Sequence, residues 1–130
     1  MWLGVSVESK AWLWRVDELR KVLSVVHFIS AEPLLEDISP ALSLNDIEWL
    51  IVGGESGAGF RPMDHAWARA LRDHCQREGV AFFFKQSAGL RTETGIVLDA
   101  RIHHGWPAVG VERNGNLTPP EDDVYPGPEF

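Results

Sequence analysis

The first half of the chain alternates between short apolar runs and one helical pattern. Strands are predicted at Trp2–Glu8, His27–Glu32 and Ile47–Val52, where apolar and β-branched residues form short runs. From about Lys10 to Val25, apolar residues recur at three- and four-residue spacing, which predicts a helix between the first two strands. The third run is apolar almost throughout, as expected of a strand that is buried on both faces.

The second half continues this pattern after a connection. Leu34–Leu44 links the second and third runs and allows for one short helical turn. Asp64 is the expected N-cap of a second helix, and Gly79 is its expected C-terminal cap. Val80–Lys85 is a fourth strand, apolar until its last residue. Beyond it the pattern weakens, and two segments predict either short strands or an irregular closing segment: Thr92–Leu98 and Arg101–Pro107.

The order of these elements predicts an α/β fold with mostly parallel strands and crossover helices. Two helices are too few to cover both faces of such a sheet, and no preceding element shields the edge of the first strand. We therefore predict a partial, TIM-barrel-like (β/α) half-barrel over residues 1–111. Its missing N-terminal half lies on another chain, or the protein self-associates, or the sequence is a fragment.

Charge separates the end of the chain from the rest. The formal net charge is −7 over 130 residues, and residues 112–130 carry five acidic residues against Arg113. Together with four prolines, this composition predicts a disordered, acidic, Pro-rich C-terminal tail. The remaining residues are close to neutral, which argues against nucleic-acid binding by this chain alone, because phosphate contacts need clustered Lys and Arg.

Cysteine content and apolar stretches exclude further classes of protein. A single cysteine, Cys75, rules out an internal disulfide framework and a site built from three or four thiolates of this chain. No metal site is predicted at His103 and His104, which point to opposite sides of an extended chain. No stretch approaches the roughly 20 apolar residues of a membrane helix, so we expect a soluble, cytoplasmic protein. Most tryptophans are predicted to be packing residues: Trp12, Trp14, Trp49, Trp67 and Trp106.

Charged residues end the predicted strands, and the candidate site is built on them: Glu8, Glu32, Glu55 and Lys85. Because the C-terminal ends of parallel strands form the ligand face of α/β proteins, these side chains are expected to converge on one crevice. The alternative is that strand ends are simply where a chain becomes polar again. Lys85 is either a cation for a ligand's carboxylate or phosphate, or an internal partner for Glu55. Arg61 is a second candidate for that partner.

The loop after the third strand is the most informative stretch. Gly53 and Gly54 directly follow the apolar run, and Glu55 and Ser56 come next. Glycines at this place allow positive φ angles and close approach of the backbone to a ligand. The spacing matches neither a phosphate-binding P-loop nor a dinucleotide fingerprint. We predict that this loop contacts a ligand; the alternative is a flexible connection.

Five motifs occur in a recognisable order: Trp2–Glu8, Phe28–Leu35, Trp49–Gly57, Arg61–Met63 and Phe82–Gln86. In this order they resemble the phage-associated, radical S-adenosylmethionine-like proteins of unknown function, over about residues 1–107. Two features depart from that family. Its members tend to follow the Lys-Gln pair with Trp-Gly, whereas this chain has Ser87-Ala88-Gly89, and the acidic tail looks like local divergence.

The resemblance implies a radical-SAM-like barrel whose N-terminal half carries a three-cysteine motif. That motif would bind a four-iron, four-sulfur cluster that reductively cleaves S-adenosylmethionine. This chain is expected to begin after it, and Cys75 cannot replace it. By resemblance, Gly53–Glu55 is similar to an adenine- or ribose-contacting segment. The strand-end residues fall on the later strands, which contact cofactor or substrate in such folds: Glu8, Glu32, Gly53, Gly54, Glu55 and Lys85.

Three hypotheses of function stay open at this point. The first is a half-barrel that holds no cofactor and is catalytically incomplete alone, with S-adenosylmethionine and the cluster belonging to the complete barrel. The second is a small self-associating binding module that uses the strand-end carboxylates for a cation or another polar ligand. The third is a surviving remnant with no current activity.

Overall fold

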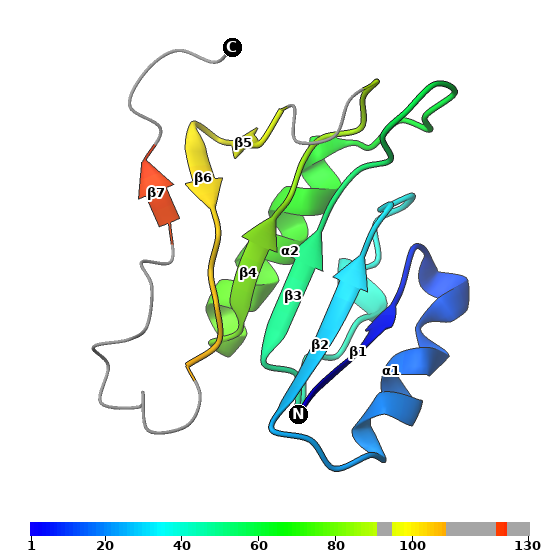
Figure 1. The fold of residues 1–130 in the computed structure, drawn as a ribbon, viewed down its shortest axis with the longest axis vertical. Helices are drawn as coiled ribbons and strands as arrows, with labels where there is room; N and C mark the ends of the chain where they lie inside the picture. The colour runs from blue at the N-terminus through cyan, green and yellow to red at the C-terminus, as the bar shows by residue number, and fades with distance from the viewer. Residues whose placement is uncertain (91–94, 109–121, 125–130) are drawn as a thin grey trace.

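A four-stranded parallel sheet is the centre of the computed structural model, which describes residues 1–90, 95–108 and 122–124. Its strands lie in the order of the sequence: β1 (Trp2–Ser6), β2 (Val26–Ala31), β3 (Trp49–Val52) and β4 (Ala81–Phe84). Each crossover therefore moves one strand further in the same direction (Figure 1). The predicted α/β fold with parallel strands is confirmed for this part of the chain.

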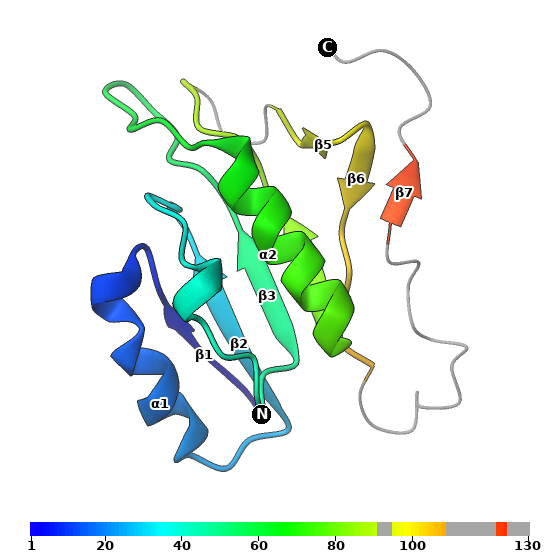
Figure 2. The same ribbon diagram turned by 180° about the vertical axis from the view of Figure 1, so that it is seen from behind.

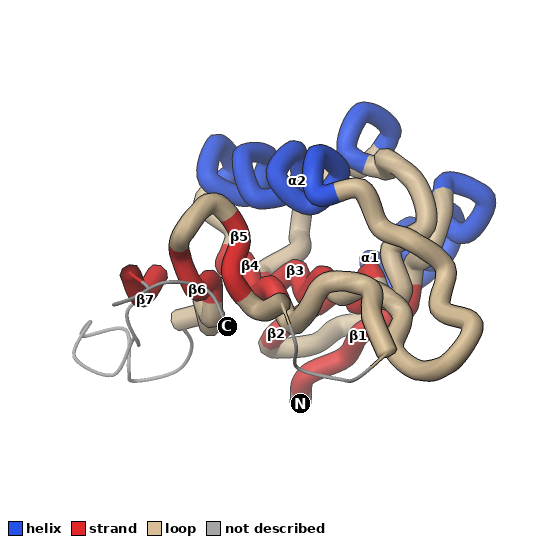
Figure 3. The backbone as a smooth tube through the Cα atoms, turned by 90° about the horizontal axis from the view of Figure 1, so that it is seen from above, coloured by secondary structure: helices blue, strands red, loops and turns tan. Residues whose placement is uncertain are grey.

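Both α-helices lie on one face of the sheet. α1 (Trp14–Arg20) and η1 (Lys10–Trp12) connect β1 to β2, and α2 (His65–Glu78) connects β3 to β4. The short turn η2 (Ser39–Ala41) lies in the connection where one helical turn was expected. Seen from behind, α2 lies over β3 and β4, while α1 lies at the outer edge beside β1 (Figure 2). The end-on view shows the helices on one side of the strands (Figure 3).

The second helix begins and ends where the sequence predicts. The Asp64 side chain accepts a hydrogen bond from the N–H of Ala66 at 2.9 Å, as an N-cap does. Gly79 ends the helix with a φ of 72°, and its N–H bonds to the carbonyl oxygen of Cys75. Because a side chain is strained at this φ, glycine is the favoured residue here.

The first helix is shorter than predicted. The apolar pattern extends over Lys10–Val25, but α1 has only seven residues and η1 is a separate turn. The chain then turns so that the Ser24 hydroxyl donates to the carbonyl oxygen of Met1 at 2.6 Å. Serine and valines in this stretch have low helix propensity, which favours the early end. As a result, Val22 and Leu23 are 48% and 97% exposed rather than packed.

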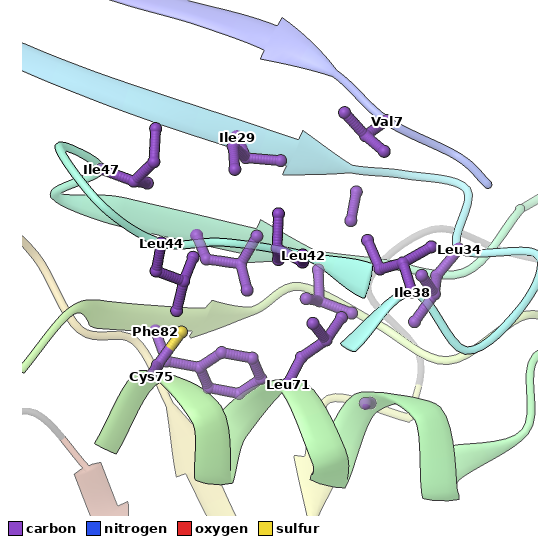
Figure 4. Packing of buried hydrophobic residues seen from close by; sticks show 14 of the residues in the cluster. Val7, Ile29, Leu34, Ile38, Leu42, Leu44, Ile47, Leu71, Cys75 and Phe82 are labelled. Carbon is purple, nitrogen blue, oxygen red and sulfur yellow. The ribbon is translucent and has the colours of Figure 1, made fainter. Parts of the chain in front are cut away.

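The hydrophobic core fills the space between the sheet and the helices. Val5, Ile29, Leu50 and Phe82 form one row of register partners across the four strands and point toward the helices. In Figure 4, Ile29 and Phe82 of this row lie on the same side of the strands as Leu71 of α2. Full burial of each such side chain contributes about 1.5–3 kcal/mol, so this layer fixes the sheet against α2.

The opposite face of the sheet carries an aromatic cluster that is only partly covered. Its centre is Trp49, which is 8% exposed, and its ring centroid lies 4.6–6.1 Å from those of four other rings: Trp2, Phe28, Phe83 and Trp106. Trp2 and Trp106 remain about two-fifths exposed. We call this side the open face. Packing is thus confirmed for Trp49, for Trp106, whose ring packs on that of Trp49, and for Trp67, which packs against the core. Trp12 and Trp14 are 40% and 55% exposed.

The two edges of the sheet differ. Along β4, Gly105 donates its N–H to the carbonyl oxygen of Phe82 at 2.9 Å, and His104 forms an antiparallel bridge with Phe83. His104 stacks on the ring of Phe83, while His103 contacts the ring of Phe82, so the two histidines do lie on opposite sides. Among the described residues, β1 pairs with β2 alone.

These edges bear on the half-barrel prediction. The outer edge of β4 is covered by an antiparallel segment rather than by a further parallel strand. The third strand is largely buried on both faces as predicted: on the open face Trp49 is buried and Ile51 is half-buried. The architecture is therefore a mixed α/β fold with one parallel sheet and two helices, and the half-barrel stays a prediction.

A small antiparallel sheet follows the parallel one. It contains β5 (Val97–Leu98), β6 (Arg101–His103) and β7 (Asp122–Val124), so the short-strand alternative for the closing segment is confirmed. Most of the predicted disordered tail, residues 112–130, lies outside the described residues, and β7 is the described part of it. No helix in the described part of the chain has the length and apolar character needed to cross a membrane.

Candidate functional site

Three residues form a polar row at the C-terminal edge of the open face. Glu32, Gly53 and Lys85 directly follow the last register partners of β2, β3 and β4: Ala31, Val52 and Phe84. Those partners belong to the core on the helix side. Because successive residues of a strand point to opposite faces, the three residues that follow lie on the open face.

The row is held together by an ion pair that crosses a whole strand. The ammonium of Lys85 lies 3.4 Å from Oε2 of Glu32, and the Ser30 hydroxyl donates to Oε1 of Glu32 at 2.8 Å. At Gly53, between them, a Cβ would lie 3.0 Å from Glu32 Oε2 and 3.4 Å from the Cβ of Lys85. Glycine therefore leaves the space that the Glu32 carboxylate uses. Lys85 pairs with Glu32, and Glu55 has a different partner.

That partner is Arg61, the other candidate named from the sequence. The Glu55 carboxylate accepts hydrogen bonds from Nε and Nη2 of Arg61 at 2.9 and 2.7 Å, and from its backbone N–H at 2.8 Å. These bonds stabilise the charged form and lower the pKa of Glu55 from 4.5 to about 2, the guanidinium bonds contributing most and the backbone bond next. The loop from Glu55 to Arg61 is thereby closed by one carboxylate.

This arrangement predicts a specific titration. Because the pKa of Glu55 is lower in the folded protein, the pair stabilises the fold fully above pH 4.5, and this contribution is lost as the pH falls toward 2. A carbon-detected NMR titration of the Glu55 carboxyl should give a midpoint near pH 2. In Arg61→Gln the midpoint should return toward 4.5. An unchanged midpoint in that variant would contradict the assignment to Arg61.

The other loop glycine makes room for the protein's own chain. A Cβ at Gly54 would lie 2.2 Å from the backbone nitrogen of Ala88. Gly54 donates its N–H to the carbonyl oxygen of Gln86 at 2.8 Å, and Gln86 Nε2 donates back to the carbonyl oxygen of Gly54 at 2.7 Å. Ser56 forms a parallel bridge with Gly89 just beyond. Gly54 therefore allows a close approach to its backbone, as predicted. The group that approaches is the 86–89 segment of the protein itself and not a ligand.

A cavity of about 330 Å³ opens beside the polar row. Five of the seven predicted site residues line it: Glu32, Gly54, Glu55, Ser56 and Lys85. Ser30 and Gln86 also line it and were not predicted as site residues. The strand period could have identified Ser30, which precedes Glu32 by two positions on the same face. For Gln86, the signal was its place directly after Lys85.

A larger cavity of about 670 Å³ lies at the other end of the sheet, between the C-terminal end of α2 and the segment around Trp106. Its main cation, Arg72, already contacts Asp73 and Asp99. We therefore place the candidate site in the smaller cavity, where Glu32 and Lys85 meet at the strand ends.

Glu8 does not share this cavity. Its carboxylate lies 3.7 Å from Nη1 of Arg15, which also donates to the carbonyl oxygen of Ser6 at 3.0 Å. Each of the three strand-end carboxylates thus has its own cation, and only Glu32 and Glu55 face the same cavity. Within residues 1–90, 95–108 and 122–124, no three His, Cys, Asp or Glu side chains are grouped so that they could hold a metal ion.

The residues present do not fit an iron–sulfur cluster. Such a cluster is held by several thiolates, and the chain has one cysteine. Cys75 is fully buried in the core on α2, and burial raises the pKa of its thiol to about 12. It therefore stays protonated at neutral pH and lies on the helix side of the sheet, away from the polar row.

The comparisons with known proteins bear on the family alone. The model of one family, described as "Protein of unknown function (DUF5131)", matches residues 1–117. That range includes all four parallel strands and every residue of the candidate site. No curated protein and no solved structure matches the chain. The chain belongs to the DUF5131 family of proteins of unknown function.

Proposed function

We propose that this protein binds a small zwitterionic molecule at the polar row of the open face. The observation that carries the proposal is the Glu32–Lys85 pair, which spans Gly53 beside the 330 Å³ cavity. An ammonium group on the ligand would bind the Glu32 carboxylate, and a carboxylate on the ligand would bind the Lys85 ammonium. Charge-assisted hydrogen bonds of this kind are stronger than neutral ones.

The solvent exposure of Glu32 and Lys85 favours the replacement of their ion pair by contacts with a ligand. The side chains of Lys85 and Glu32 are 50% and 23% exposed. Ion pairs this accessible to water contribute only about 0–1 kcal/mol, so separating the two groups costs little. A ligand that carries both an ammonium and a carboxylate group would replace the one weak ion pair between Glu32 and Lys85 by two ion pairs with the protein. Ser30, which already donates to Glu32, keeps that carboxylate oriented during the exchange.

Calorimetric titration with S-adenosylmethionine and with L-methionine tests the proposal, since both carry an ammonium and a carboxylate. We expect saturable binding of at least one of them. Glu32→Gln and Lys85→Met should each weaken it about tenfold or more, because a hydrogen bond to a charged group contributes about 1.5–3 kcal/mol.

The matched control is Glu18→Gln, which removes an exposed carboxylate that pairs with Lys21 at 2.8 Å on α1. Binding in this variant should equal that of the unmodified protein. Absence of binding by both probes, or equal losses in the control and the two site variants, would contradict the proposal.

A second candidate function is favoured by the strand order. Four parallel strands in sequence order with both helices on one face are what part of a (β/α) barrel would show. In this candidate the chain is the ligand-binding half of a radical-SAM-like barrel. The other half would supply the cluster, and S-adenosylmethionine would be the zwitterion. The residues described above would bind and orient it, and the chain alone would be inactive.

Iron–sulfur reconstitution tests this second candidate. Cluster absorbance is expected only when the chain is mixed with a polypeptide that carries a three-cysteine motif and forms a one-to-one complex with it. Absorbance from this chain alone, or no complex with such a polypeptide, would contradict the candidate and leave the binding proposal intact.

A further inference from the structure

One buried polar atom at the candidate site has no hydrogen-bond partner. Among the described residues, two side-chain polar atoms are buried without one, Glu8 Oε1 and Gln86 Oε1. Glu8 Oε1 lies 3.7 Å from the guanidinium of Arg15, whereas Gln86 is a neutral side chain that is only 4% exposed. Leaving such an acceptor unpaired costs free energy, so native proteins rarely do it without a reason. Gln86 lines the cavity beside the polar row, so a ligand bound there can supply the missing partner.

The neighbouring backbone fixes which end of the Gln86 amide stays unpaired. Nε2 donates to the carbonyl oxygen of Gly54 at 2.7 Å, and the Gly54 N–H donates to the backbone carbonyl oxygen of Gln86 at 2.8 Å. If the amide turned over, Oε1 would face the Gly54 carbonyl oxygen, and two acceptors would meet. The group left available at the cavity is therefore an acceptor, and it requires an N–H or O–H donor from a ligand.

The Gln86 amide and the Glu32 carboxylate border the same space. A Cβ at Gly53 would lie 3.0 Å from Glu32 Oε2 and 3.3 Å from Gln86 Nε2. Ser30 already donates to Glu32 Oε1, so Oε2 is the carboxylate oxygen that becomes available when Lys85 is displaced. A primary ammonium has three N–H donors. One of them can bind Glu32 Oε2, and a second then needs another acceptor close by. A trimethylated ammonium has no N–H to donate.

We propose that Gln86 Oε1 is the second acceptor for the ligand's ammonium group and makes the site selective for primary ammonium groups over trimethylated ones. Gln86 is then a specificity-determining residue, and this inference rests on the proposed binding of a zwitterion. Lys85 also borders the space at Gly53, with its Cβ 3.4 Å from the same point, so the movement of Lys85 that frees Glu32 also uncovers the Gln86 amide. Ligand binding thereby satisfies the acceptor that is unpaired in the free protein.

Calorimetric titration with matched probes tests this selectivity. The probe that binds, L-methionine or S-adenosylmethionine, is compared with the same compound trimethylated at its α-amino nitrogen, which keeps the ammonium and carboxylate charges but has no N–H. The unmodified protein should bind the primary amine at least about tenfold more tightly. In Gln86→Met this preference should fall by about tenfold, because the primary amine loses one hydrogen bond to its charged group and the trimethylated compound loses none. A change in the shape of the site would weaken binding of both compounds and leave the ratio of their affinities unchanged.

Two control variants accompany this comparison. Lys85→Met should weaken binding of both compounds equally, because each keeps the carboxylate that Lys85 would bind. Gln76→Met removes an exposed glutamine of α2 and should change neither affinity. A preference that is unchanged in Gln86→Met, or an unmodified protein that binds both compounds equally, would overturn the role of Gln86 and leave the proposed zwitterion site intact. Absence of binding by both primary amines would instead contradict the proposed function, and this inference with it.

Discussion

Replacing Phe84 by alanine is expected to lower the free energy of unfolding by about 3–5 kcal/mol. Phe84 is among the largest fully buried side chains, at the end of β4 on the side that faces α2. Removing its ring takes away apolar contacts and leaves a cavity that the rigid surroundings fill only in part. Urea denaturation followed by tryptophan fluorescence measures the change.

The neighbouring residue provides a matched control. Phe83 has the same side chain but lies on the open face and is only half-buried, stacked against His104. Phe83→Ala should cost about half as much or less, since less apolar area returns to water. Equal losses at the two positions would show that the open face is covered in solution as fully as the helix side.

Gly54→Ala is expected to lower the free energy of unfolding by about 3 kcal/mol, the upper part of the usual range for overpacking. The added Cβ would meet the backbone of Ala88 at 2.2 and 2.6 Å, and backbone atoms cannot rotate away as a side chain can. The shift would separate Gly54 from Gln86, so ligand binding at the polar row should weaken in the same variant. Thermal and urea denaturation measure the first effect and calorimetric titration the second.

Gly59→Ala separates crowding from backbone strain. Gly59 has a φ of 78°, which strains any other residue, but its Cβ would meet nothing within 4 Å. The expected cost is therefore about 1–2 kcal/mol, that of the left-handed backbone alone. If Gly54→Ala costs no more than this control, the 86–89 segment can move aside and is not part of a fixed site.

The elements that sequence predicted well are those with local signals. α2 is bounded by Asp64 and Gly79, whose roles as caps depend only on adjacent backbone groups. α1 was overestimated because its apolar period continues through Val22 and Leu23, although the chain there has already turned toward β2. Periodicity shows which residues are apolar, but packing decides which of them are buried.

For the candidate site, the sequence predicted where the charged residues lie better than it predicted which residues they pair with. Glu32 and Lys85 do lie together at the strand ends, as parallel strands require. Their pairing could not be predicted, because it depends on the register that places Gly53 between them. Glu8 follows the same rule along the chain, yet it turns toward Arg15 and leaves the cavity. Ion pairs of this kind depend on tertiary geometry, so they cannot be predicted from the strand pattern alone.

The three hydrogen bonds from Arg61 to Glu55 have a kinetic consequence. They fix the ends of the loop that carries Ser56 before any ligand arrives, so the conformational entropy of that loop is already lost on folding. Because this loop is already ordered, a ligand can bind to it without a separate ordering step. Association rates should then depend linearly on ligand concentration, and in Arg61→Gln they should level off as loop ordering becomes the slow step.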